Sequence, residues 1–139
     1  MHKKLLGGLI VAQLLGSVSS SAQVAPPTAM VFFDWGKVEI QRDYAAALDK
    51  VAAIAVSDPN ARLVVEGHSD RSGPAVASQR SSTRRAETVR DYLVGRGVPA
   101  TRIEVKAWGE ERLLIVTADG VREPQNRRVD VRLIASGTR

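Results

Sequence analysis

The chain has 139 residues, 44% of them hydrophobic, which suits one domain with one core but not two. Only 4% of the residues are aromatic, so we expect no surface of stacked rings for single-stranded nucleic acid. The formal net charge of +5 would by itself allow a polyanionic partner. Because the sequence contains no cysteine, we expect neither a disulfide framework nor a lipid-modified cysteine.

Residues 1–22 have the pattern of a secretory signal peptide, with a basic start, an apolar stretch and small residues at the end. Lys3 and Lys4 form the basic start, and Ser20 and Ala22 are the small residues. Cleavage after Ala22 would remove two positive charges and release the mature protein into the periplasm, where we expect no nucleic-acid partner and no membrane-spanning segment. An uncleaved membrane anchor is the alternative, although an anchor needs about 20 uninterrupted apolar residues.

The first half of the domain is expected to form a strand, a helix and a second strand. Residues 23–28 are a linker, because two adjacent prolines fit neither a helix nor a central strand. Residues 29–35 predict a strand, since three apolar residues follow one another there. Apolar residues then recur at helical spacing from residue 40 until Asp58-Pro59-Asn60 ends the helix. Residues 61–67 predict the second strand.

The next element is expected to be a helix that begins at Pro74, where the missing N–H of proline is tolerated. Gly95 and Gly97 are placed to end it. Arg85 lies at the edge of the buried face, where packing would hold its stem while its guanidinium stays in water. The residues expected to face the core are Ser82, Ala86, Val89 and Leu93.

Residues 102–108 and 128–134 alternate apolar and polar side chains, which is the pattern of strands with one face in water. A long connection, residues 109–125, separates them. The order strand, helix, strand, helix, strand, strand predicts an α+β domain over residues 29–135, with two helices packed on a four-stranded sheet. Residues 136–139 remain as a C-terminal tail.

The turn after the second strand carries His68, Ser69 and Asp70 in succession, so a hydrolase and a metal site have to be considered. A catalytic triad needs the histidine between the other two groups, and three consecutive turn residues point in different directions. A metal cage needs more ligands, but the only other histidine is His2 and there is no cysteine. We therefore expect no enzyme, no metal and no cofactor, and we expect His68 to pack at the end of the strand.

Asp70 and Arg85 form the more informative pair, because the turn that holds Asp70 leads directly into the helix that carries Arg85. Each has a purely local alternative, a turn hydrogen bond for the aspartate and a solvated charge for the arginine. Exposed together, they suit a zwitterion, since the carboxylate accepts from an ammonium and the guanidinium binds a carboxylate. Further along, Arg127 and Arg128 are adjacent on a strand, so at most one can reach a given site.

Several motifs follow one another between residues 31 and 133: Gly67-His68-Ser69-Asp70, Gly73, Arg85-Ala86, Tyr92-Leu93, Gly97-Val98, Arg102-Ile103, Gly109-Glu110 and Asn126-Arg127-Arg128-Val129-Asp130. In this order they resemble the OmpA-like peptidoglycan-binding domain. The resemblance implies a non-catalytic module, a mixed four-stranded sheet with helices on one face, that binds the stem peptide of the cell wall. It also implies a location in the periplasm, associated with the peptidoglycan or the outer membrane of a Gram-negative bacterium.

The resemblance further implies roles for particular residues. The aspartate at position 70 would take the ammonium, and the arginine at position 85 the carboxylate, of the free end of diaminopimelate. Binding residues are then Asp70, Arg85, Asp34, Gly36 and Arg128, with His68, Ser69, Gly73 and Asn126 in support. The chain departs from the family pattern where the usual Thr is Ser69, a Tyr-Asn pair is Ala77-Ser78 and a Leu is Ser81.

Three functions from different classes follow from these observations. The leading hypothesis is non-covalent binding of peptidoglycan through the diaminopimelate of its stem peptide, with a contribution to envelope organisation. The alternative is a periplasmic protein–protein interaction module with a vestigial pocket, which would contact envelope proteins near Leu113 and Val116. The third, a peptidoglycan hydrolase, is not expected because the sequence offers no catalytic arrangement.

Overall fold

The computed structural model describes residues 26–136, so the predicted signal peptide, half of the linker and most of the tail lie outside the described residues. No helix in this part of the chain combines the length and apolar character needed to cross a membrane. The helices and strands follow in the order β1 (Ala29–Phe32), α1 (Arg42–Ser57), β2 (Arg62–Gly67), α2 (Ala75–Gly95), β3 (Ile103–Ala107) and β4 (Arg128–Ile134), with short 3-10 turns η1 (Ala100–Arg102) and η2 (Pro124–Asn126).

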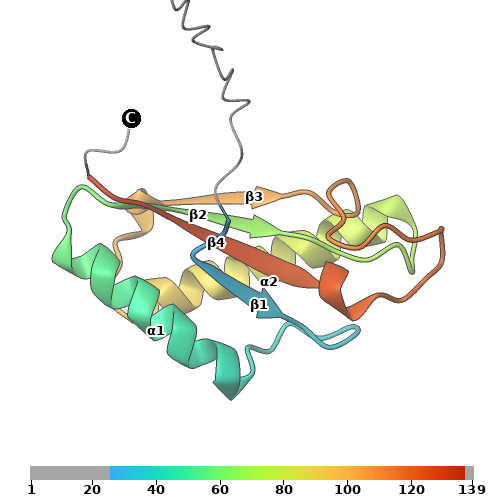
Figure 1. The fold of residues 1–139 in the computed structure, drawn as a ribbon, viewed down its shortest axis with the longest axis horizontal. Coiled ribbons are helices and arrows are strands. Elements are labelled where there is room, and N and C mark those ends of the chain that lie inside the picture. The colour runs from blue at the N-terminus through green and yellow to red at the C-terminus, as the bar shows by residue number, and fades with distance from the viewer. Residues whose placement is uncertain (1–25, 137–139) are drawn as a thin grey trace, which may run out of the picture.

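The four strands form one mixed sheet, as predicted, and their order in it is β1-β4-β2-β3 (Figure 1). β2 and β3 are parallel, whereas β4 is antiparallel to both of its neighbours, β1 and β2. β4 pairs with β1 along one edge, from residue 128, and with β2 along the other, up to residue 134. The last strand is therefore a central strand of the sheet. The expected α+β architecture is therefore confirmed.

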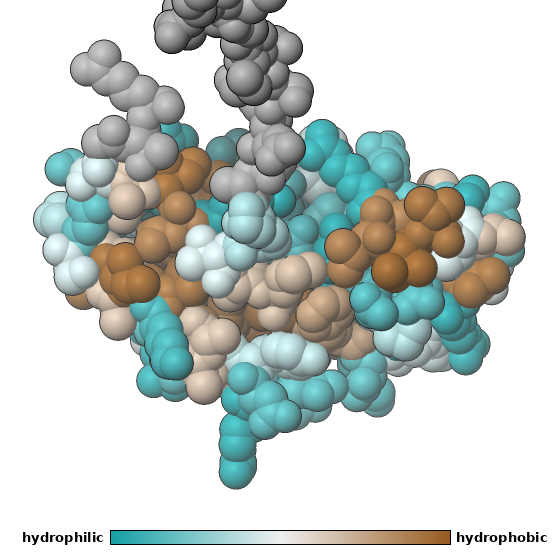
Figure 2. All heavy atoms as spheres, in the orientation of Figure 1, coloured by the Kyte–Doolittle hydropathy of each residue, from teal (hydrophilic) through white to brown (hydrophobic). Residues whose placement is uncertain are grey.

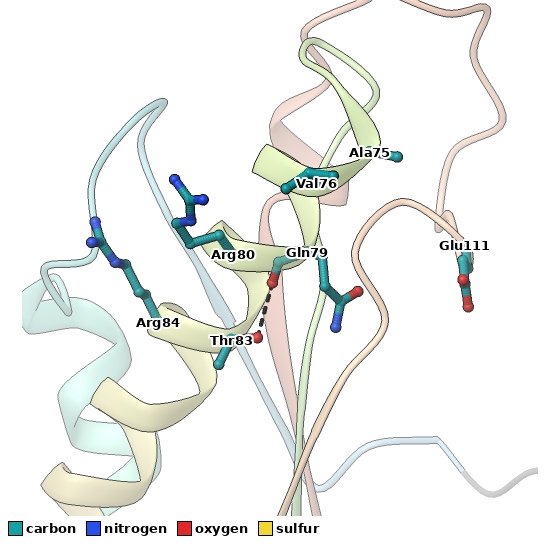
Figure 3. A pocket seen from close by; sticks show the side chains of 7 residues that line it. All are labelled: Ala75, Val76, Gln79, Arg80, Thr83, Arg84 and Glu111. Atoms are coloured by element: carbon teal, nitrogen blue, oxygen red, sulfur yellow. Dashed lines mark hydrogen bonds between the residues drawn. The ribbon is translucent and has the colours of Figure 1, made fainter.

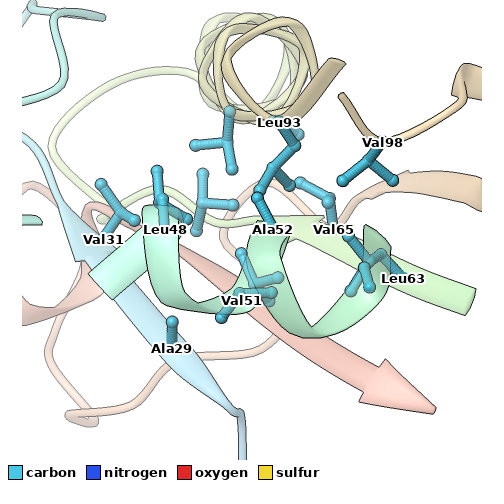
Figure 4. Packing of buried hydrophobic residues seen from close by; sticks show 14 of the residues in the cluster. Ala29, Val31, Leu48, Val51, Ala52, Leu63, Val65, Leu93 and Val98 are labelled. Carbon is cyan, nitrogen blue, oxygen red and sulfur yellow. The ribbon is translucent and has the colours of Figure 1, made fainter. Parts of the chain in front are cut away.

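The core lies between one face of the sheet and both helices (Figure 4). Alternating residues of the strands point toward the helices, and the predicted buried face of α2 meets them there. Most of the side chains involved are branched or small, as the low aromatic content requires. The main contributors are Val31, Phe33, Leu63, Val65, Val129 and Val131 from the strands and the loop after β1, Leu48, Val51 and Ala55 from α1, and Ala86, Val89 and Leu93 from α2.

β1 is shorter than the predicted strand because the chain turns away from the sheet after Phe33. The backbone N–H of Phe33 donates to the carbonyl of Arg127, and the chain then makes a tight turn in which Lys37 N donates to Asp34 O. Gly36 adopts a φ of 69° in this turn, a conformation that other residues rarely adopt. The turn brings the loop between β1 and α1 toward the end of β2.

Gly67 is the closest point between the sheet and α2. A Cβ atom at this position would lie 2.0 Å from the backbone oxygen of Ser82, so any side chain would push the helix away from β2. We expect Gly67→Ala to lower the free energy of unfolding by roughly 1–3 kcal/mol, because overpacking of this kind is destabilising. Thermal unfolding measures the effect, and Gly95→Ala is the matched control since nothing lies within 4 Å of a Cβ there. Equal stability of the two variants would contradict the close packing.

Candidate ligand-binding site

A small pocket lies where the end of β2, the start of α2 and the loop after β1 meet. Its volume is about 150 Å³. The side chains of Asp70 and Arg85 both line it, so the structure brings together the two residues on which the sequence argument rested. The complete lining is Trp35, Gly36, Ser69, Asp70, Ser72, Gly73, Ala77, Ser78, Ser81, Arg85 and Arg127.

The carboxylate of Asp70 is buried, with only 2% of the residue exposed, and four donors already occupy it. Oδ1 accepts from the backbone N–H of Ser72 at 3.2 Å and from its hydroxyl at 2.6 Å. Oδ2 accepts from Nη1 of Arg127 at 3.0 Å and from the backbone N–H of Glu123 at 3.2 Å. Since a carboxylate offers about four acceptor positions, Asp70 organises the pocket by joining three segments of the chain.

Burial by itself would raise the pKa of the Asp70 carboxyl. The hydrogen bonds from Ser72 and Arg127, together with the positive charge of Arg127, outweigh burial and lower the pKa from its ordinary value of 3.8. The expectation that Asp70 and Arg85 are exposed is wrong, because Arg127 and the chain around Glu123 cover the aspartate and the loop after β1 covers the arginine.

The guanidinium of Arg85 is also buried, with 3% of the residue exposed, and it is only partly satisfied. Its Nε donates to the carbonyl of Lys37 at 3.2 Å, and its carbon lies 5.6 Å from the centre of the Phe33 ring. Nη1 is buried and has no hydrogen-bond partner. Burial, and then the charge of Arg127, lower the pKa of Arg85, while the charge of Asp70 opposes this. A buried guanidinium with an unused donor can donate to an anionic group.

Arg127 lines the pocket, and the predicted Arg128 does not. Val129 points into the core, so Arg127 shares its side of the strand and Arg128 points to the opposite face. Nε of Arg127 donates to the carbonyl of Phe33 at 3.1 Å, which ties the pocket arginine to the loop after β1. The expectation that Arg128 completes the pocket is therefore wrong, and the alternation around Val129 could have identified Arg127.

Arg128 instead belongs to a buried cluster on the other face of the sheet. Its Nε donates to Oδ1 of Asp130 at 3.1 Å, and Nε2 of His68 lies 3.4 Å from Oδ2 of the same carboxylate. Burial would raise the pKa of Asp130, but the nearby His68 ring and the charge and hydrogen bond of Arg128 lower it. His68 therefore supports the sheet and does not reach the pocket.

The remaining predicted residues divide between the pocket and its surroundings. Gly36, Ser69 and Gly73 line the pocket, whereas Asp34 is exposed and lines a separate cavity beside Tyr44. Asn126 is buried and holds the long connection, because its side chain accepts from Leu114 N and Ile115 N and donates to Ile115 O. It supports the loop that carries Glu123 to Asp70.

Small side chains widen the pocket along α2. Ala77, Ser78 and Ser81, three positions at which the sequence departs from the family pattern, line it. Ala77 is exposed, Ser78 is buried and Ser81 is half-buried, so the first two departures leave open space and a polar wall rather than a gap in the hydrophobic core. Sequence reasoning did not assign these residues to the site.

Acid should destabilise the domain through its two buried carboxyls. The pKa values of Asp70 and Asp130 are lower in the folded chain than the ordinary 3.8, so the unfolded chain binds protons first. Their stabilisation is fully present above about pH 4 and is lost as the pH falls through the folded values. Urea unfolding at pH 6 and at pH 3 measures this loss, and we expect Asp130→Asn to show a smaller loss than the wild type. An equal loss in both would show that Asp130 does not contribute.

Within residues 26–136, no group of three or more His, Cys, Asp or Glu residues is placed to hold a metal ion. The pocket chemistry is that of two guanidinium groups, one fully bonded carboxylate and several hydroxyls. It can accept an anionic group at Arg85, and a cation can reach Asp70 only by replacing one of its present donors.

Comparison with known proteins gives matches along most of the chain. The model of the OmpA family matches residues 32–127. A peptidoglycan-associated lipoprotein of Rhizobium meliloti is 36% identical over 108 residues, covering 78% of this chain and 61% of the relative. A protein of the same name from Haemophilus influenzae is 34% identical over 98 residues, covering 70% of this chain and 64% of the relative. The chain thus spans less than two thirds of the length of these relatives.

The fold is also similar to solved structures. The crystal structure of the peptidoglycan-associated lipoprotein from Burkholderia pseudomallei superposes with a TM-score of 0.71 at 28% sequence identity, covering 76% of this chain and 90% of that one.

Proposed function

The chain belongs to the OmpA family, and on this basis we propose that it is a non-catalytic module that binds peptidoglycan non-covalently in the bacterial envelope. Relatives from Gram-negative bacteria carry the name peptidoglycan-associated lipoprotein, which supports the same association and a periplasmic location for this chain. The observation that carries the proposal is the buried Nη1 of Arg85, a cationic donor without a partner on a residue that lines the pocket.

We infer that the ligand is the free end of a diaminopimelate residue in the stem peptide. Its carboxylate would accept from Nη1 of Arg85, which relieves the cost of an unpaired buried donor. Its ammonium would take the place of the Ser72 hydroxyl on Oδ1 of Asp70, since Ser72 is half-buried and the hydroxyl can turn away. The zwitterion would then satisfy both charged groups of the pocket.

Catalysis does not fit the same pocket. Ser69, Ser72, Ser78 and Ser81 line it, but a serine nucleophile needs an adjacent general base. The carboxylate of Asp70 accepts from the Ser72 hydroxyl, yet its lowered pKa and its three other donors make it a poor base. His68, the only histidine among residues 26–136, faces Asp130 on the other side of the sheet. A binding role needs no such base.

A single site of this kind binds weakly. Hydrogen bonds to charged groups contribute only about 1.5–3 kcal/mol each, so we expect a dissociation constant in the micromolar to millimolar range for one stem peptide. Retention on the wall then depends on the many stem peptides that the polymer presents and on any tether or oligomer that raises the effective concentration.

Co-sedimentation with purified sacculi tests the proposal. Wild-type protein should be retained, and a soluble stem peptide that contains diaminopimelate should release it. The matched competitor contains lysine in place of diaminopimelate, which removes only the second carboxylate, and should release far less protein. Failure of the sacculi to retain the protein would contradict peptidoglycan binding, and equal competition by the two peptides would contradict the assignment of diaminopimelate.

A second function, contact with an envelope protein, is favoured by one feature of the long connection. Leu114, Ile115 and Val116 are 45%, 38% and 88% exposed, and Asn126 holds this segment in place through three hydrogen bonds. Figure 2 shows hydrophobic residues gathered over the end of the molecule where the β3–β4 connection lies in Figure 1. Rigid exposed apolar side chains of this kind mark interaction surfaces. Crosslinking in extracts without sacculi would support this function if one protein were captured by wild type and not by Val116→Asp.

A further inference from the structure

Two arginines of α2 differ from most others in the described part of the chain. The side chains of Arg80 and Arg84 have no hydrogen bond, ion pair or ring contact within residues 26–136. Arg42 and Arg62 are the only other arginines of this kind there. The remaining arginines bond to carboxylates or carbonyls or stack on rings, namely Arg71, Arg85, Arg90, Arg96, Arg102, Arg112, Arg122, Arg127, Arg128 and Arg132.

Arg80 and Arg84 lie one helical turn apart and extend to the same side of α2, away from Glu111 (Figure 3). They line a shallow groove of about 550 Å³ along the N-terminal half of the helix. Like charges four residues apart destabilise a helix slightly, so this pair does not serve stability. Val76, which is 71% exposed, adds an apolar surface to the groove, and Thr83 adds a hydroxyl.

The groove adjoins the pocket along the surface of α2. Ala77 and Ser81 line the pocket. Arg80 follows Ala77 by three residues and Arg84 follows Ser81 by three, and residues three apart are neighbours on the surface of a helix. Arg85, the buried cation of the pocket, directly follows Arg84 in the chain. A polymer with its end in the pocket would therefore pass close to the two unpaired arginines.

We propose that this groove, which we call the α2 groove (Ala75, Val76, Gln79, Arg80, Thr83, Arg84 and Glu111), is a second contact site that binds carboxylates of peptidoglycan outside the pocket. The inference rests on the proposed function. Guanidinium groups bind carboxylates through paired hydrogen bonds, and two of them one turn apart fit a peptide that carries several carboxylates. Ala75 and Val76 supply the surface for its methyl groups.

Sacculus binding by the double variant Arg80→Gln/Arg84→Gln tests the α2 groove. We expect roughly tenfold weaker retention on sacculi and a smaller loss of binding when salt is raised, because exposed ion pairs are weak singly and are screened by salt. Binding of a soluble diaminopimelate-containing stem peptide in the pocket should be unchanged, and thermal stability should be equal or slightly higher. The matched control is Arg42→Gln/Arg62→Gln, which removes two unpaired arginines elsewhere.

The outcomes separate the groove from the pocket. Retention of the Arg80→Gln/Arg84→Gln protein at the level of the control would overturn the groove. A loss of soluble-peptide binding in that variant would also overturn it, because the arginines would then act on the pocket. If the wild type binds neither sacculi nor the soluble peptide, the proposed function fails and the groove fails with it. A wild type that binds both, with an unaffected double variant, leaves the proposed function standing.

Discussion

Arg85→Met should abolish the release of protein from sacculi by the diaminopimelate peptide, and reduce retention strongly, without destabilising the domain. Methionine fills much of the same space, but it removes a buried guanidinium whose Nη1 has no partner. Replacing a buried, poorly satisfied charge by an apolar group is often neutral or stabilising. Loss of one buried charge-assisted contact to the ligand corresponds to roughly 10- to 100-fold weaker binding.

Calorimetric titration with the soluble stem peptide and thermal unfolding measure the two effects in the same samples. Arg90→Met is the matched control, because Arg90 lies on the same helix and pairs with Asp91 at the surface. Wild-type affinity in Arg85→Met would remove Arg85 from the binding site. A large loss of stability would instead show that Arg85 supports the fold.

Asp70→Ala, unlike Arg85→Met, should strongly destabilise the domain. We expect its free energy of unfolding to fall by about 3–5 kcal/mol, because removal of one member of a buried ion pair leaves the other uncompensated. Arg127 would lose its carboxylate partner, while Ser72 and the backbone N–H of Glu123 would lose their acceptor. The domain would then hold two buried guanidinium groups, Arg85 and Arg127, without a counter-charge.

A double-mutant cycle with Arg127→Met measures the coupling of the pair. Urea unfolding of the two single variants and of Asp70→Ala/Arg127→Met should show that the double change costs less than the sum of the single ones. Additive losses would mean that the ion pair of 3.0 Å between Nη1 and Oδ2 contributes little to folding. Because Asp70→Ala is expected to be unstable, weaker ligand binding by this variant identifies Asp70 as a ligand-binding residue only if the variant is still folded under the conditions of the binding measurement.

The fold could be predicted because its elements repeat simple patterns. The alternation of Val129, Val131 and Leu133 gave the bounds of β4, and the helical spacing of Ala86, Val89 and Leu93 gave the buried face of α2. The order of strands in the sheet could not be read from periodicity, since every arrangement of these strands buries the same apolar faces. The family resemblance implied a mixed sheet, and the structure supplies the order of its strands.

The candidate site was predicted in part. Proximity in the chain placed Asp70 and Arg85 together, because a short turn separates the strand end from the helix. Arg127, which covers Asp70 and forms an ion pair with it, lies 57 residues further along the chain. No local pattern reports a contact of that separation, so the exposure of the pair was misjudged. The assignment of Arg128 ignored a signal that was present, the alternation of side chains around Val129.

The position of β4 bears on when the domain can form. β4 is the last strand along the described chain, yet it is the only described neighbour of β1 and separates β1 from β2. A polypeptide that leaves a ribosome or crosses a membrane from its N-terminus can pair β2 with β3 early, but β1 has no neighbour until β4 emerges. The ion pair between Asp70 and Arg127 has to wait for the same segment. Sheet and pocket are therefore completed together, in one late step, and the emerging chain remains open until then.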